Sequence, residues 1–140
     1  MNARAKFLGL THTHYANPHG LDAPGHYTSA SDLVKLAEIA MRNPIFETIV
    51  ATQEYVIPAT DQHKAYNLQN TDLLLGSYNG AEGIKTGTTG NAGACLVFAA
   101  LRNDAELIGV VLGAPDDPTR YSDARALLDW GFTVVADTGQ

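Results

Sequence analysis

The strongest candidate for chemistry in this sequence is Lys85-Thr86-Gly87, inside a run of small and polar residues over Gly83–Cys95. The pattern of residues 83–88 predicts a β-strand. A lysine on a strand supplies a fixed cation that attracts a carboxylate, and the neighbouring threonine hydroxyl can bind the same carboxylate. Glycine has no side chain, so a peptide backbone can lie along the strand edge as an added strand. The tripeptide alone fits either a surface strand with ordinary polar residues or a site for an extended peptide that carries a carboxylate.

A lone Lys-Thr-Gly is a weak signal, because three common residues match by chance in many proteins. The longer string is far more specific: Gly83-Ile84-Lys85-Thr86-Gly87-Thr88-Thr89-Gly90-Asn91-Ala92-Gly93-Ala94-Cys95. It resembles the third active-site motif of the penicillin-binding protein and β-lactamase superfamily. Within that superfamily it is similar to the serine-type D-alanyl-D-alanine carboxypeptidases, peptidase family S11. Residues 13–21 and 25–28 resemble the segment that those enzymes place between their second and third motifs, so the resemblance covers nearly the whole chain.

The resemblance implies a function and a role for each motif residue. The family removes the terminal D-alanine of the peptidoglycan pentapeptide through an acyl-serine intermediate, binds β-lactams and needs no cofactor. Lys85 is then catalytic, helping to move protons at the nucleophile, and Thr86 and Gly87 bind substrate. The backbone N–H of Thr88 is implied as a second oxyanion-hole donor, a contribution typically worth roughly 3–4 kcal/mol of barrier. Such an enzyme works on the outer side of the cytoplasmic membrane, in the periplasm or at the cell wall.

The serine nucleophile of this chemistry has no counterpart in the 140 residues. The family needs a serine followed three residues later by lysine, and none of Ser29, Ser31, Ser77 and Ser122 has that spacing. Ser77-Tyr78-Asn79 has the spelling of the second motif, but it stands only eight positions before Lys85, so we predict a turn over residues 77–80. We expect the nucleophile and the second motif to precede Met1. Residues 1–140 would then form a partial transpeptidase-like domain without its amino-terminal portion, inactive alone.

The residue pattern is also compatible with two other functions. The chain could be a non-catalytic module that binds cell-wall peptides, or completes a partner, through the Lys85 strand. It could also belong to a β-lactamase-like hydrolase. The segment Asn17-Pro18-His19-Gly20-Leu21 favours the carboxypeptidases over the β-lactamases, because the resemblance at these residues is to the former.

Five histidines and one cysteine could suggest a metal site, yet we predict none. His12, His14, His19 and His26 share one segment without an acidic or cysteine ligand at a recognised spacing. Hydrogen bonds that organise the loop are the expected role, with Asn17 and His19 shaping turns. The single cysteine, Cys95, lies in an apolar run and is predicted to be a small buried side chain.

Composition narrows the class of protein. The 45% hydrophobic and 17% charged residues are typical of one globular domain. A net charge of -6 with scattered basic residues argues against nucleic acid as a partner. No apolar run approaches the roughly 20 residues of a membrane span. The basic start over residues 1–7 lacks an apolar segment, so no signal peptide is predicted in this chain.

The elements predicted around the motif give an α+β fold, part of the penicillin-binding protein and β-lactamase-like class. Residues 1–8 read as the end of a helix capped by Gly9, and residues 10–27 as a long structured loop. A helix follows a capping sequence at residues 29–32, and Pro44 begins a second helix, with Ile45, Phe46, Ile49 and Val50 available for burial. Residues 53–57 predict a short strand; residues 61–76 have no assignment.

An antiparallel sheet with a closing helix is predicted for the rest. Strands cover residues 83–88, 94–102 and 105–112, and Asn103-Asp104 joins the last two as a tight turn. A helix opens at Asp117-Pro118 and ends at Trp130-Gly131. The apolar strand 107–112 suits a sheet interior, yet in a three-stranded sheet it would be an edge. Either strands from residues outside this chain or a partner, including another copy, would cover it, and we expect the chain to self-associate.

Overall fold

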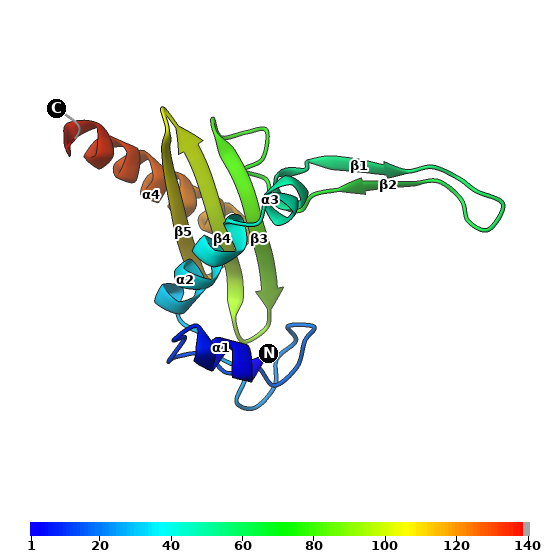
Figure 1. Ribbon diagram of the computed structural model, residues 1–140, viewed down its shortest axis with the longest axis horizontal. Helices are drawn as coiled ribbons and strands as arrows, with labels where there is room; N and C mark the ends of the chain where they lie inside the picture. The colour runs from blue at the N-terminus through cyan, green and yellow to red at the C-terminus, as the bar shows by residue number, and fades with distance from the viewer. Residues whose placement is uncertain (139–140) are drawn as a thin grey trace.

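The computed structural model describes residues 1–138, which form a three-stranded sheet between two layers of helices, with a separate hairpin. Figure 1 shows α4 behind the sheet, α2 and α3 in front of it, and the β1–β2 hairpin projecting away from both. In chain order the elements are α1 (Asn2–Phe7), α2 (Ala30–Met41), α3 (Pro44–Ala51), β1 (Glu54–Ile57), β2 (Tyr66–Gln69), β3 (Ala81–Thr89), β4 (Gly93–Arg102), β5 (Ala105–Ala114) and α4 (Asp117–Thr138). The predicted α+β class is confirmed.

The sheet is antiparallel in the order β3-β4-β5, as predicted. Asn103 and Asp104 both have positive φ, 49° and 64°, which is the conformation of a type I′ hairpin turn. This turn fixes the register, so that Phe98 on β4 lies opposite Gly109 on β5. A Cβ at Gly109 would come within 2.3 Å of the Phe98 ring, so only glycine leaves room for that ring.

The main core lies between the sheet and α4. Leu96 and Phe98 on β4 pack with Ala124 and Leu128 on α4, and all four are at most 1% exposed. Alternation along β4 sends these side chains to one face of the sheet. The layer therefore attaches α4 to β4, the strand that pairs with the Lys-Thr-Gly strand β3.

A smaller core lies on the α2 and α3 side. Ala37 and Met41 of α2 pack with Ala99 of β4, and Phe46 and Val50 of α3 cover them in part. Both helices begin where the sequence predicts. Ser29 caps α2 by accepting the N–H of Asp32 at 3.2 Å, and Asn43 caps α3 by accepting the N–H of Ile45 at 3.0 Å, ahead of Pro44 in the first turn. The expected burial of Ile45 and Ile49 was wrong, because these side chains are 71% and 64% exposed.

The segment between α3 and β3 contains a hairpin that was only half predicted. The expected strand over residues 53–57 is β1, but its partner β2 falls in the stretch left without assignment. Tyr55 pairs with Leu68 and Ile57 with Tyr66, so one face of the hairpin is apolar although these residues lie mostly outside the core. Figure 1 shows the hairpin extending beyond the layered body, and neither core cluster of the described residues includes a residue of β1 or β2.

The helix α4 continues past its predicted end. We expected it to stop at Trp130-Gly131, but it runs to Thr138. A Cβ at Gly131 would lie 2.8 Å from the Leu107 side chain, so this glycine allows α4 to approach β5 closely instead of ending the helix. No helix among residues 1–138 is both long and apolar enough to cross a membrane.

Strand β5 is an edge, as the three-strand count required. Within the described residues it pairs with β4 alone, and its apolar stretch is largely half-buried against α4 and α2. The prediction that further strands or a partner cover its other side stays a prediction.

Candidate active site

The four predicted site residues, Lys85, Thr86, Gly87 and Thr88, follow one another along β3. In the sheet that residues 1–138 form, β3 is an edge strand. The Lys85 side chain is exposed, and its ammonium group donates a hydrogen bond to the carbonyl oxygen of Thr86. A cation and a hydroxyl thus come from consecutive residues of a strand that forms an edge of the sheet.

Gly87 leaves open space beside that edge. A Cβ at Gly87 would have no heavy atom within 4 Å apart from its own chain neighbours, in contrast to Gly109, where the Phe98 ring fills the space. Gly87 also lies outside the left-handed region of φ, so neither packing nor backbone conformation demands glycine there. The room it leaves is available to an approaching backbone.

The Thr86 hydroxyl is held by a residue that sequence reasoning did not single out. Its Oγ1 lies 2.6 Å from the Oγ1 of Thr71, in the loop that follows β2. The carbonyl of Thr71 accepts a hydrogen bond of 2.8 Å from the hydroxyl of Tyr121, which is buried on α4. The motif strand is therefore linked to the closing helix through Thr71.

Arg120 is the second residue that the sequence did not reveal. It lies in the first turn of α4, is 3% exposed and pairs with Asp117 at 3.0 Å. Its Nη1 donates to the carbonyl of Cys95 at 3.1 Å, to Thr88 Oγ1 at 3.3 Å and to the carbonyl of Gly87 at 3.4 Å. A buried guanidinium thus joins β3 to β4 directly behind the motif and holds the Thr88 side chain.

Little in the sequence could have identified Arg120. Its only local sign is the spacing to Asp117, three residues earlier on the same helix, which is a common ion-pair spacing. The contacts that matter reach Thr88, 32 residues away, and Gly87, 33 residues away. They exist only once α4 packs on the sheet.

Asp22 fastens the long loop to the end of β3. One carboxylate oxygen accepts the hydroxyl hydrogen of Thr89 at 2.7 Å, and the other accepts the N–H of Asn91 at 3.2 Å. Between this loop and the strands lies a largely apolar cavity, whose wall includes Leu21, Tyr27 and Cys95. Cys95 is half-buried there, not fully buried as predicted.

The histidines of the loop make the organising hydrogen bonds that were predicted. His14 Nδ1 lies 2.6 Å from the carbonyl of Gly25, and His19 Nδ1 accepts the N–H of Leu21 at 3.2 Å. The amide of Asn17 closes the same turn, donating to the carbonyl of Leu21 at 2.8 Å. Over residues 1–138, no three His, Cys, Asp or Glu side chains are grouped as metal ligands would be.

Asp32 anchors the start of the loop to α2. The carboxylate is 2% exposed and accepts the N–H of His12 at 2.8 Å and the hydroxyl of Thr13 at 2.7 Å. Burial alone would raise the pKa of Asp32, but the hydrogen bonds from Thr13 and His12 outweigh it and keep this pKa below its usual value. The ionised carboxylate therefore fixes the loop relative to the helix.

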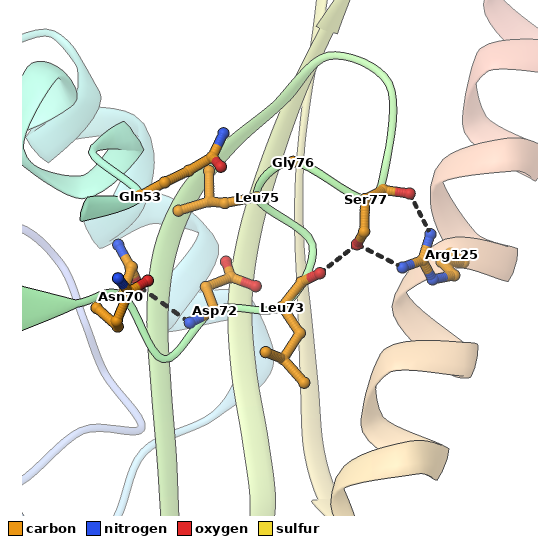
Figure 2. A pocket seen from close by; sticks show the side chains of 9 residues that line it. Gln53, Asn70, Asp72, Leu73, Leu75, Gly76, Ser77 and Arg125 are labelled. Carbon is orange, nitrogen blue, oxygen red and sulfur yellow. Dashed lines mark hydrogen bonds between the residues drawn. The ribbon is translucent and has the colours of Figure 1, made fainter.

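Ser77 lies in a turn, as predicted, and its hydroxyl is already occupied. Figure 2 shows it between Leu73 and Arg125 at the side of a polar pocket. Its Oγ donates to the carbonyl of Leu73 and accepts from Arg125 Nη2 at 2.7 Å, while Arg125 Nη1 binds the Ser77 carbonyl at 3.1 Å. These contacts explain Ser77-Tyr78-Asn79 as a structural turn.

Comparison with solved structures defines the class of this fold. The crystal structure of the Streptomyces K15 DD-transpeptidase superposes with a TM-score of 0.89 at 39% identity, over 94% of this chain and 52% of that one. A D-alanyl-D-alanine carboxypeptidase from Mycobacterium tuberculosis H37Rv superposes with a TM-score of 0.84 at 37% identity, over 94% of this chain and 51% of that one. The fold is therefore that of the penicillin-binding DD-peptidases.

The family model described as D-alanyl-D-alanine carboxypeptidase, Peptidase_S11, matches residues 1–116, and the chain belongs to this family. Among curated relatives, the D-alanyl-D-alanine carboxypeptidase of Streptomyces sp. strain K15 is 38% identical over 96% of this chain and 47% of its own length. DacB2 of Mycobacterium tuberculosis is 40% identical, with the same two coverages. The chain thus spans about half the length of these relatives.

Proposed function

We propose that this chain supplies the Lys-Thr-Gly half of a serine-type D-Ala-D-Ala carboxypeptidase site that acts on peptidoglycan stems outside the cytoplasmic membrane and is acylated by β-lactams. The observation that carries the proposal is the accessible edge of β3, where the Lys85 cation, the Thr86 hydroxyl and the open side of Gly87 follow one another. Membership of the S11 family supports the same reaction.

The site divides the work between binding and proton transfer. The Thr86 hydroxyl binds the terminal carboxylate of the pentapeptide, and Lys85 attracts the same group and helps to move protons at the serine. The peptide backbone lies along β3 beside Gly87 as an added strand. The Thr88 N–H donates to the oxyanion that forms on the attacked carbonyl, and Arg120 holds Thr88 in place from behind.

The reaction itself needs a serine that the 140 residues do not provide in a Ser-x-x-Lys setting. Its oxygen attacks the carbonyl carbon of the penultimate D-alanine, and the C–N bond breaks as the departing D-alanine amine takes a proton. Water then hydrolyses the acyl-serine ester. In this proposal the serine lies on the part of the family domain that the relatives have beyond the matched half.

The test is release of D-alanine from a pentapeptide ending in D-Ala-D-Ala, by a protein that joins this chain to the Ser-x-x-Lys portion of an S11 domain. We expect release, and a fall in kcat/KM of about tenfold for Thr86→Val, because a hydrogen bond to a charged group is lost. Thr60→Val, in the distant hairpin loop, is the matched control. Binding of the pentapeptide without D-alanine release would instead support the non-catalytic cell-wall module.

A further inference from the structure

Thr71 presents a second hydroxyl at the site. It is exposed, comes from a different segment than the motif, and lies with its Oγ1 2.6 Å from Thr86 Oγ1. A contact this short between two hydroxyl oxygens is a full hydrogen bond, in which one hydroxyl donates and the other accepts. The direction of that bond decides whether the Thr86 hydrogen is free for a ligand.

The backbone around Thr71 is fixed on both sides. The Asn70 amide donates to the carbonyls of Val50 at 3.2 Å and Thr52 at 2.9 Å. The Asn70 side-chain oxygen accepts the N–H of Asp72 at 2.9 Å. The Tyr121 hydroxyl also donates to the carbonyl of Thr71, so Thr71 is held in place without any help from Thr86. Its hydroxyl is thus presented to the motif by a rigid turn.

We propose that Thr71 is a positioning residue for substrate binding: its hydroxyl donates to Thr86 Oγ1, which directs the Thr86 hydrogen to the terminal carboxylate of the acyl donor. This inference rests on the proposed function. A carboxylate only accepts hydrogen bonds, so Thr86 gives it its single hydrogen and keeps its oxygen lone pairs as acceptors. Thr71, 2.6 Å away, then has to be the donor. A chain of two hydroxyls ending on a charge strengthens each bond in turn.

The experiment compares Thr71→Val, which keeps the branched shape without the hydroxyl, with Thr71→Ser, which keeps the hydroxyl. It uses the joined protein described above and two thioesters of one N-acyl-D-alanine, whose leaving groups end in a carboxylate or in the corresponding amide. For the carboxylate thioester, Thr71→Val lowers the second-order acylation rate about tenfold, and Thr71→Ser stays within about threefold of wild type. For the amide thioester both variants react like wild type.

A double-mutant cycle with Thr86→Val separates positioning from a general loss of structure. If Thr71 acts through Thr86, Thr71→Val causes no further loss once the Thr86 hydroxyl is gone. Equal losses on both thioesters, additive losses with Thr86→Val, or a wild-type rate for Thr71→Val on the carboxylate thioester would each overturn the inference. A wild-type protein that neither thioester acylates would refute the proposed function itself, so the two failures are distinguishable.

Discussion

Replacing Arg120 by Met removes the buried guanidinium behind the motif strand and keeps an unbranched side chain of similar length. The change leaves the carbonyls of Gly87 and Cys95 and the Thr88 hydroxyl without this donor. Each of these hydrogen bonds comes from a charged group, and such a bond contributes about 1.5–3 kcal/mol. The carbonyls can keep their strand-ladder partners, and relief from burying a charge offsets part of the loss. The pair with Asp117, whose side chain is 59% exposed, contributes at most about 1 kcal/mol.

The net expectation is a loss of about 2–3 kcal/mol in the free energy of unfolding, or about 6–9 °C in Tm for a domain of this size. Thermal unfolding followed by circular dichroism measures it. Arg125→Met is the matched control, because Arg125 lies on the same helix and its hydrogen bonds among the described residues go to the exposed Ser77, with the Tyr78 ring 5.8 Å from the guanidinium. We expect it to lower Tm by about 3 °C or less. Faster amide exchange at Gly87–Thr89 should accompany Arg120→Met alone. A variant Arg120→Met that melts at or above the wild-type temperature would refute the view that the guanidinium holds these strands together.

Two further predictions concern alkaline pH and assembly. Burial, followed by the hydrogen bond to Asp129 at 2.6 Å, raises the pKa of Tyr78 to about 12. The folded chain therefore holds this proton more tightly than the unfolded chain. The contribution of Tyr78 to stability is full below about pH 10 and falls as pH rises toward 12. Denaturant titrations across that range should show the fall in wild type and its reduction in Tyr78→Phe, and equal slopes would contradict the assignment. The apolar edge of β5 predicts self-association of the chain at micromolar concentrations, or exchange of elements between copies; light scattering that finds a monodisperse monomer would count against it.

The predictable parts of this molecule were those encoded by neighbouring residues. The β4–β5 hairpin follows from Asn103-Asp104 between two apolar runs, and α3 begins where Asn43 and Pro44 place it. The helix end at Gly131 was missed because glycine has two uses, as a helix stop and as a gap for close packing. Only the position of Leu107 against α4 decides between them.

The candidate site residues on β3 were predictable from the sequence, but the residues that contact them from other elements were not. Lys85, Thr86, Gly87 and Thr88 share one strand, so a motif match located them together. Thr71 and Arg120 reach that strand from a loop and a helix that are distant in sequence. Hydroxyl and guanidinium groups occur throughout the chain, and neither residue has a local pattern that marks it for this place.

Covalent labelling with a fluorescent penicillin tests whether the Lys85 strand serves a serine that lies outside these 140 residues. We expect no label on the 140-residue chain alone, and label on the serine when the chain is joined to the Ser-x-x-Lys portion of the domain. Lys85→Ala should slow that labelling about 100-fold or more, in the range typical of a lost proton-transfer group. Label on the chain alone would contradict a serine outside these residues, and an unchanged labelling rate of the joined protein after Lys85→Ala would contradict a catalytic Lys85.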